Sequence, residues 1–131
     1  MKRLVLLFVI FSSFTTINAP KEQKILGNWK IAKLVYKEKI SYNLYKERTS
    51  GTENKFRIHF NSNHTAVLSN PQASAKDTLQ WNMTHKKITI TYNGNHTLLK
   101  PLNGTHKIKA LNNSRMELLD AAETTTIHFE R

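Results

Sequence analysis

The side chains in this chain that could do chemistry are its 6 histidines and 9 acidic residues, because the sequence holds no cysteine. The lack of cysteine excludes disulfides, thiolate metal sites and cysteine nucleophiles. The sequence also lacks HExxH, a glycine-rich phosphate loop and Gly-x-Ser-x-Gly. Asp77 and Glu117 lie at polar positions, so we expect them to be solvated rather than to act as a catalytic pair. We therefore predict that the protein is not an enzyme and needs no cofactor.

The histidines are too dispersed to predict a metal site. Metal ligands on strands need histidines at i and i+2 or on facing strands, and no His-x-His occurs. His59 and His128 alternate with apolar residues, which predicts that both side chains face solvent. His106 instead shares the parity of Ile108, which predicts that His106 faces the interior of the fold.

The chain is strongly basic, with 20 Lys and Arg against 9 Asp and Glu and a formal net charge of +11. Basic faces of this kind could meet an acidic polysaccharide or a phosphate-bearing partner, and the alternative is a soluble basic surface without one. The basic residues are not interleaved with exposed aromatic residues, so we expect no nucleic-acid partner. The basic residues on polar strand faces or turns include Lys55, Arg57, Lys86, Lys87, Lys107 and Lys109.

The first nineteen residues have the layout of a secretory signal peptide. Met1-Lys2-Arg3 is basic, Leu4 to Phe11 is an unbroken apolar run, and Ala19 is a small residue at the predicted cleavage site. The apolar run is too short to span roughly 30 Å of hydrocarbon. A buried N-terminal strand or helix is the alternative. We expect residues 1–19 to be a signal peptide, the protein to be exported to the periplasm or the extracellular space, and residues 20–131 to form one domain.

That domain is predicted to be all-β. From Ile25 onward apolar and polar residues alternate with a period of two, and turn residues such as Asn93-Gly94 and Asn103-Gly104 separate the runs. Hairpin-length connections favour an antiparallel up-and-down order of eight or nine strands. The predicted strands are 29–37, 55–60, 65–69, 78–83, 88–92, 96–100, 105–111, 115–120 and 125–130.

One long connection, from Glu38 to Asn54, has two interpretations. A connection of this length in a compact domain is commonly a binding loop or a lid, in which case Ile40 to Tyr45 would cover the mouth of a barrel. Ile40, Tyr42 and Leu44 also alternate with polar residues, which would suit an extra edge strand. Both alternatives remain open.

Several motifs occur in a familiar order along the predicted strands. They are Gly27-Asn28-Trp29 at the start of the first strand, Leu79-Gln80-Trp81, Ile88-Thr89-Ile90, Met116-Glu117-Leu118 and the terminal Phe129-Glu130-Arg131. This series resembles lipocalins, and in particular the short lipocalin-like domains exported by Bacteroidetes. The resemblance spans Ile25 to Arg131.

The resemblance implies a lipocalin-like β-barrel in which Trp29 packs across one end and Arg131 lies over its ring. It gives Gly27, Trp29 and Arg131 structural roles. Because the domain is short, the barrel should be shallow, and an eight-stranded barrel either fills with side chains or holds one small ligand.

The leading functional hypothesis is a secreted, monomeric binding protein for a small hydrophobic or amphipathic ligand. His106 and Tyr92 would orient the ligand inside the barrel. The alternative is a non-catalytic envelope module with a filled barrel, whose basic surface binds an anionic glycan or protein. The residues expected to line the interior are Phe56, Ile58, Phe60, Trp81, Ile90, Tyr92, His106, Ile108, Met116 and Leu118.

Overall fold

The computed structural model describes residues 19–50, 55–71, 76–94 and 96–131. The predicted signal peptide lies outside these residues except for Ala19. Nine antiparallel strands form one sheet, preceded by a short helix. In chain order the elements are α2 (Ala19–Ile25), β1 (Gly27–Ser41), β2 (Leu44–Thr49), β3 (Phe56–Phe60), β4 (Thr65–Ser69), β5 (Lys76–Thr84), β6 (Lys87–Thr91), the 3-10 helix η1 (Thr97–Leu102), β7 (Gly104–Leu111), β8 (Arg115–Asp120) and β9 (Thr125–Glu130).

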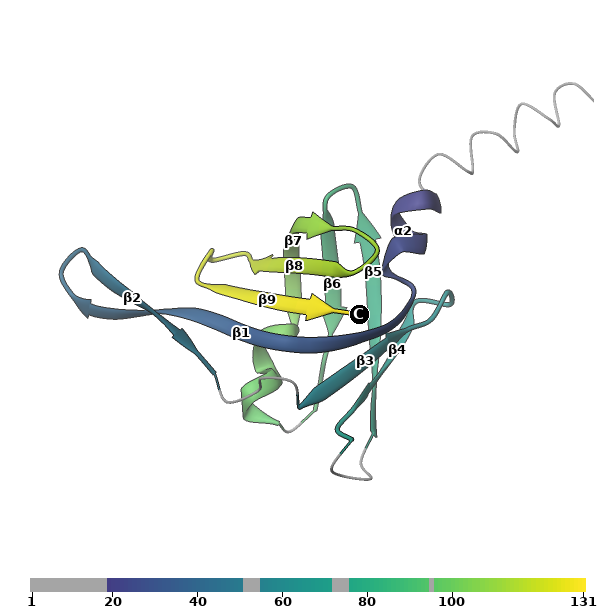
Figure 1. Ribbon diagram of the computed structural model, residues 1–131, viewed down its shortest axis with the longest axis horizontal. Coiled ribbons are helices and arrows are strands. Elements are labelled where there is room, and N and C mark those ends of the chain that lie inside the picture. The colour runs from purple at the N-terminus through teal and green to yellow at the C-terminus, as the bar shows by residue number, and fades with distance from the viewer. Residues whose placement is uncertain (1–18, 51–54, 72–75, 95) are drawn as a thin grey trace, which may run out of the picture.

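The sheet closes into a barrel because β1 pairs with strands on both of its edges. Its first residues, from Gly27 to Ile31, pair with β3, and the next stretch, from Lys30 to Tyr36, pairs with β9. The register with β9 shifts between Ile31 and Lys33, and such a bulge bends a strand. Figure 1 shows β1 sweeping from β3 across to β9. The predicted all-β, up-and-down fold is confirmed: eight strands close the barrel, and β2 is an additional strand.

Alternation places the apolar residues inside the barrel. On β3, Phe56, Ile58 and Phe60 are buried, whereas Arg57 between them is exposed. Burial of this kind contributes about 25 cal/mol per Å² of apolar surface. The buried apolar residues form one cluster of Ile25, Trp29, Ile31, Leu34, Phe56, Ile58, Phe60, Ala66, Leu68, Leu79, Trp81, Ile88, Ile90, Tyr92, Leu99, Leu102, Met116, Leu118, Ile127 and Phe129.

The prediction of a strand at 96–100 is wrong, because Thr97–Leu102 forms the 3-10 helix η1. Two physical features explain the difference. Pro101 has no N–H to donate to a strand ladder, and Leu99 and Leu102 are three residues apart, which is the repeat of a 3-10 helix. Both leucines are buried, with exposed fractions of 1% and 0%. The helix therefore covers one end of the barrel, called here the η1 end.

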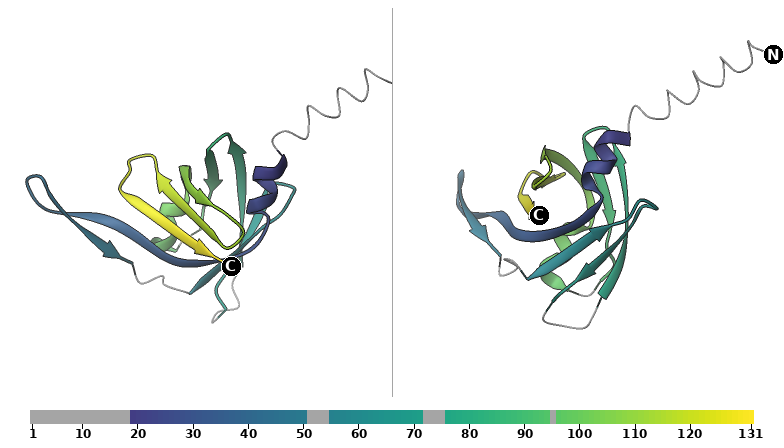
Figure 2. Two further views of the ribbon diagram at one scale, coloured as in Figure 1. Left: turned by 45° about the horizontal axis from the view of Figure 1, so that its top comes forward. Right: turned by 45° about the vertical axis from the view of Figure 1, so that its right-hand side comes forward.

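The long connection contains an edge strand, so that alternative is confirmed. β1 continues to Ser41, and β2 pairs back along it from Ser41↔Leu44 to Val35↔Thr49. This β1–β2 hairpin extends away from the barrel in both Figure 1 and Figure 2, rather than folding over a mouth. Residues 51–54 of the connection lie outside the described residues.

The opposite end of the barrel, called here the α2 end, is where α2 leads into β1 and where the β5–β6 and β7–β8 turns lie. Among the residues that the structure describes, no helix combines the length and the apolar character needed to cross a bilayer.

Candidate functional site

Trp29 seals the α2 end of the barrel. Its indole N–H donates a hydrogen bond of 2.7 Å to the backbone carbonyl of Ile25 in α2. The guanidinium carbon of Arg131 lies 4.0 Å from the centroid of the Trp29 ring, which is a cation–π contact. The structure thus brings together Trp29 and Arg131, the contact that the resemblance to lipocalins implies.

Arg131 is also held by three backbone carbonyls. Its guanidinium donates to the carbonyl oxygens of Lys24, Leu26 and Asn113 at 2.7, 2.7 and 2.8 Å. Gly27 has a φ of +104°, where a side chain would be strained, and a Cβ there would lie 3.5 Å from Arg131 Nη1. These contacts join the end of the last strand to the segment between α2 and β1.

Nine of the ten predicted interior residues are buried in the barrel, and Ile108 is the exception. Ile108 is only partly buried because the β7–β8 register shifts between Ile108 and Ala110. It therefore lies at a surface hollow, described below. The buried residues of this set are Phe56, Ile58, Phe60, Trp81, Ile90, Tyr92, His106, Met116 and Leu118.

Side chains occupy the barrel interior. Trp29, Phe60 and Phe129 are at most 1% exposed, and η1 adds two leucines at its own end. Surface hollows among the described residues include some with volumes of about 310 to 440 Å³. Of the predicted interior residues, only Trp81 and Ile108 line one of these hollows.

His106 is the buried polar residue of the core, with an exposed fraction of 1%. Its Nε2 lies 2.7 Å from the carbonyl oxygen of Leu102, so Nε2 carries the proton and donates. Burial lowers the pKa of His106, while the Leu102 carbonyl and the negative charge of Asp120 act in the opposite direction. Nδ1 has no hydrogen-bond partner among the described residues.

Asp120 is the last residue of β8 and lies opposite His106 of β7 in the strand register. Burial alone would raise its pKa, but hydrogen bonds from the Thr125 N–H and from the hydroxyl and N–H of Thr124, together with the charge of His106, lower it. The bonds from Thr124 and Thr125 tie the turn between β8 and β9 to the carboxylate.

Tyr92 is the other polar group near η1. The pKa of its hydroxyl is raised, chiefly by burial and further by the nearby Asp77 carboxylate, whereas the His96 backbone acts to lower it. Within the described residues the hydroxyl has no hydrogen bond of good geometry. A Cβ on Gly94 would lie 2.3 Å from the Tyr92 ring, so the glycine allows the ring to pack there.

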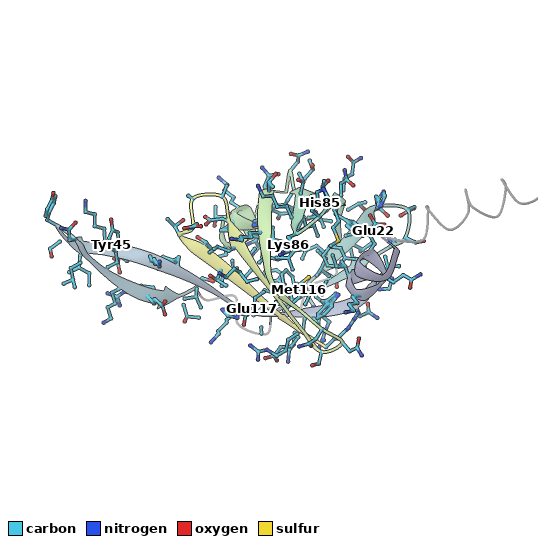
Figure 3. The ribbon with its side chains drawn as sticks, turned by 90° about the horizontal axis from the view of Figure 1, so that it is seen from above. Glu22, Tyr45, His85, Lys86, Met116 and Glu117 are labelled. Atoms are coloured by element: carbon cyan, nitrogen blue, oxygen red, sulfur yellow. The ribbon has the colours of Figure 1, made fainter. Side chains whose placement is uncertain are left out.

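The hollow that combines charge with apolar surface lies at the α2 end, and we call it the basic hollow. It has a volume of about 310 Å³ and lies between α2, the β5–β6 turn and β7. Figure 3 labels two of its residues, His85 and Lys86. Its lining residues are Lys24, Met83, His85, Lys86, Ile108, Lys109, Ala110 and Leu111.

The basic hollow is amphipathic. Its apolar part consists of Met83, Ile108 and Leu111, which are partly buried and pack against the core. The remaining lining includes three lysines and a histidine, and none of the described lining residues is acidic. Such a lining suits a ligand that carries a negative charge on an apolar body.

A further pair of lysines adds positive charge on the neighbouring strands. Lys87 on β6 is directly opposite Lys107 on β7, and both are exposed. Like charges directly opposite each other on a sheet are destabilising. Together with Lys86 and Lys109 they give this side of the barrel a positive potential that would attract anions.

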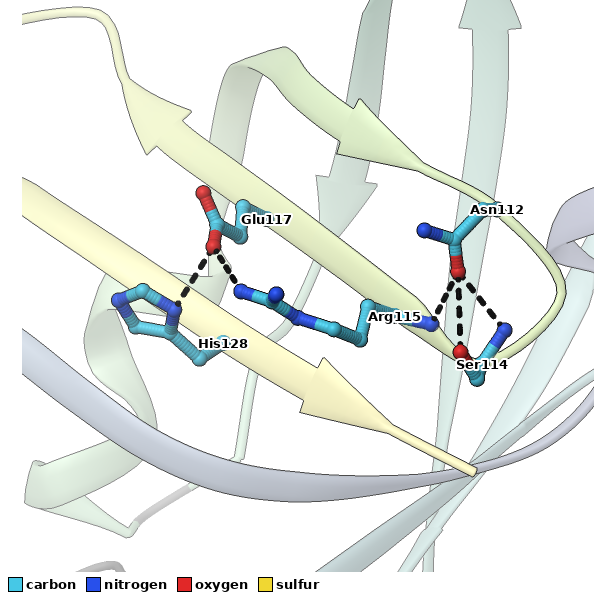
Figure 4. Close-up of polar contacts among 5 residues, drawn as sticks. All are labelled: Asn112, Ser114, Arg115, Glu117 and His128. Atoms are coloured by element: carbon cyan, nitrogen blue, oxygen red, sulfur yellow. Dashed lines mark hydrogen bonds and ion pairs between the residues drawn. The ribbon is translucent and has the colours of Figure 1, made fainter.

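Glu117 makes two polar contacts on the outer surface of the barrel. Glu117 Oε1 accepts a hydrogen bond of 2.8 Å from Arg115 Nη2 and lies 3.4 Å from Nδ1 of His128, its cross-strand neighbour. The Glu117 side chain is 25% exposed. Figure 4 shows this cluster beside the turn in which the Asn112 side chain accepts hydrogen bonds from Ser114 and from the Arg115 N–H. The cluster joins β8 to β9 on the outer surface and has a structural role.

Sequence reasoning missed the basic hollow as a site. It assigned Ile108 to the interior and Lys86 and Lys109 to a general basic surface. Lys24, Met83 and Leu111 were not singled out, because only the fold brings α2 next to β5 and β7. Among the described residues there is also no group of three or more His, Asp or Glu side chains placed to hold a metal ion.

Comparison with known proteins identifies the fold. No family model matches the chain, and no curated protein matches it. A lipocalin-like protein from Bacteroides uniformis aligns with a TM-score of 0.56 at 14% identity, covering 82% of this chain and 98% of that chain. A DUF4847 family protein from Bacteroides vulgatus aligns with a TM-score of 0.60 at 14% identity, covering 84% of this chain and 95% of that chain. The chain therefore has the lipocalin-like fold that its sequence motifs predict.

Proposed function

We propose that this protein is a non-catalytic binding protein for a small amphipathic anion, which it holds in the basic hollow. A lipocalin-like fold suggests a binding function. The observation that carries the proposal is the lining of the hollow, in which Lys24, Lys86 and Lys109 stand beside partly buried apolar side chains.

The chemistry of the ligand follows from that lining. A carboxylate or phosphate would accept charge-assisted hydrogen bonds from the lysine ammonium groups. A short apolar chain would then cover Met83, Ile108 and Leu111 and remove them from water. The volume of about 310 Å³ is near the lower limit of small-molecule sites, which favours a short ligand such as a medium-chain carboxylate.

The barrel interior is a second candidate site, favoured by one observation. His106 Nδ1 is buried without a hydrogen-bond partner among the described residues, and the buried Tyr92 Oη, near Asp77 and the His96 backbone, has no hydrogen bond of good geometry there. Buried polar groups are costly to leave unpaired. A ligand entering there would have to displace Leu99 and Leu102 of η1, both of which are buried.

The test is a set of titrations followed by calorimetry and by amide NMR. Octanoate carries both the charge and the apolar chain, octanol lacks the charge, and acetate lacks the chain. We expect octanoate to bind at least tenfold more tightly than either. The double variant K86A/K109A should weaken octanoate binding at least tenfold, because it removes two of the three lysines.

The matched control is K55A/K100A, which removes the same charge from exposed positions outside the hollow. It should bind octanoate as the parent protein does. An equal loss in both double variants would overturn the proposal in favour of general charge attraction. Shifts centred on Tyr92 and His106, and absent at Lys86, would move the site to the interior. Binding of an anionic glycan without octanoate binding would support the alternative envelope module.

We also infer that the protein is exported to the periplasm or the extracellular space and acts there as a monomer. The basic leader and its apolar run support export. Protein purified from the exported fraction is therefore the proper material for these titrations.

A further inference from the structure

The β1–β2 hairpin is the most exposed apolar part of the described structure. Its strand residues pass beyond the barrel after Tyr36, where the pairing of β1 with β9 ends. All six residues of β2 are exposed. From Tyr36 to Ser41 an extended strand rises roughly 16 Å, and Figures 1 and 2 show the hairpin projecting to one side.

Four of the five exposed apolar side chains of this hairpin lie at its tip, and the fifth, Tyr36, lies at its base. Of the six large hydrophobic residues that are exposed in the described part of the chain, five lie on the hairpin. Tyr42 at the turn is 87% exposed, and Tyr45, also near the tip, is labelled in Figure 3 far from the barrel. A group of exposed apolar side chains such as this one commonly marks a site of interaction with a protein or a membrane. The five residues are Tyr36, Ile40, Tyr42, Leu44 and Tyr45.

The register places the apolar side chains at the tip on both faces of the hairpin. Lys39 is opposite Tyr45, and Ser41 is opposite Leu44. Because neighbouring residues on a strand point to opposite faces, Leu44 and Tyr45 lie on different faces of the hairpin. A flat protein surface could contact only one of these faces, whereas a fluid interface can surround both.

Basic residues form a collar directly behind the tip. Lys39 and Lys46 are the charged residues nearest to it, and Lys37 and Arg48 follow further back. Glu38 pairs with Arg48, and Glu47 is opposite Lys37. Counting Lys37, Lys39, Lys46 and Arg48 against Glu38 and Glu47 leaves the hairpin with a net charge of +2.

We propose that this hairpin docks the protein on an anionic phospholipid surface, with its tip in the headgroup region and its lysines on lipid phosphates. Tyrosine suits the boundary between water and hydrocarbon, because it joins an apolar ring to a polar tip. Lysine chains can lie along apolar surface while their ammonium groups reach the phosphates. Charge complementarity is the argument for an anionic surface.

A second copy of the chain is a poorer occupant. The outer edge of β2 is unpaired within the described residues, so edge-to-edge pairing is geometrically open. That pairing would bring the Lys46 and Arg48 rows of two positively charged strands together, and charged edge residues are a common defence against it. The proposal is independent of the octanoate site, because the hairpin and the basic hollow share no residue.

The experiment measures binding of the exported protein to vesicles by co-sedimentation. Vesicles of phosphatidylcholine alone are compared with vesicles containing 30% phosphatidylglycerol (about a third of the lipid charged). We expect binding to the anionic vesicles that is at least tenfold tighter than binding to the neutral ones. The tip variant I40S/L44S and the collar variant K39A/K46A should each weaken it about tenfold or more.

Two controls match these changes outside the hairpin. L98S removes the sixth exposed apolar side chain, and K55A/K100A removes two exposed lysines. Both should bind vesicles as the parent does, and all four variants should bind octanoate unchanged if that site also exists. Equal loss in K39A/K46A and K55A/K100A, or equal binding to neutral vesicles, would overturn the proposal.

A second measurement reports the insertion directly. Because the chain has no cysteine, Y42C can be labelled at a single site with an environment-sensitive dye. Its fluorescence should shift to the blue on anionic vesicles and be quenched by lipid-borne quenchers, whereas the same dye on S62C, an exposed turn residue, should not respond. No response at Y42C, or a concentration-dependent dimer that I40S/L44S abolishes, would overturn membrane docking.

Discussion

At the scale of single residues, the alternation of the strand predicted correctly that His106 is buried, but it did not predict which groups surround the ring. The side chain points inward with the apolar residues, and there it meets the backbone carbonyl of Leu102 rather than a second polar side chain. Nδ1 stays unpaired in the described structure, and burial disfavours a positive charge on the ring more than the Asp120 charge favours it. A histidine buried in this way couples the stability of the fold to pH.

His106 should make the protein less stable as the pH falls below about 6.5. Its folded pKa lies below the ordinary 6.5, so between these values the unfolded chain binds a proton that the folded protein does not. Stability is then lost with falling pH at up to about 1.4 kcal/mol per pH unit. H106Q, whose amide N–H can still donate to Leu102, should have a flatter profile in urea titrations from pH 7.5 to 5.

Asp120 does not blur that measurement. Its folded pKa is lowered, so the stability it contributes is present above its ordinary value of 3.8 and is lost only at more acidic pH. Parallel profiles for H106Q and the parent protein between pH 7.5 and 5 would contradict the role assigned to His106.

At the scale of elements, the 3-10 helix η1 covers one end of the barrel. A strand at 96–100 would have left the end of the barrel to loops. The 3-10 helix instead buries Leu99 and Leu102 in the core and leaves Leu98 41% exposed. The Leu102 carbonyl also accepts the hydrogen bond from His106, so the helix and the buried histidine hold each other in place.

Leu99 and Leu98 offer a matched pair for testing the role of η1. L99A should lower the free energy of unfolding by about 2–5 kcal/mol, because it removes buried methyl groups and leaves a cavity. L98A, one residue earlier and exposed, should change it by less than about 0.5 kcal/mol. Chemical denaturation of both variants checks the difference, and similar values for the two would mean that η1 does not close the core.

At the scale of the whole molecule, both proposed binding sites lie on the outer surface of the barrel and not in its interior. The barrel is closed by β1–β9 pairing and filled by side chains, the basic hollow lies at the α2 end, and the hairpin projects beyond the barrel. A small basic protein of this design could hold an amphipathic anion at one site while another part rests on an anionic surface. Both proposals depend on the protein reaching a compartment where such partners occur.

We propose that export removes residues 1–19. Intact-mass spectrometry of protein from the exported fraction should then report a chain beginning at Pro20. A substitution of Arg for Leu7, within the apolar run, should block export and leave the full-length chain inside the cell, since the h-region must be apolar. An exported protein that retains Met1 to Ala19 would contradict the domain boundary.

The sequence by itself determined most of the strands, their up-and-down order and their inward faces, because a period of two is a local property of each run of residues. Phe56, Ile58 and Phe60 are buried as their spacing predicts. It misjudged 96–100, where Leu99 and Leu102, three residues apart, and Pro101 suit a 3-10 helix. It also left the segment from Glu38 to Asn54 undecided, because Ile40, Tyr42 and Leu44 alternate in the manner of a strand without being buried.

Only the tertiary structure decided how the barrel interior is packed and which distant residues meet on its surface. Whether inward side chains leave a cavity depends on how tightly the facing strands and η1 pack, and no local sequence pattern contains that volume. The basic hollow joins Lys24 with Lys86 and Lys109, residues far apart in sequence that come together through barrel closure. The pairing of Trp29 with Arg131 depends on the same closure, because the first and last strands must meet before the ring and the guanidinium can touch.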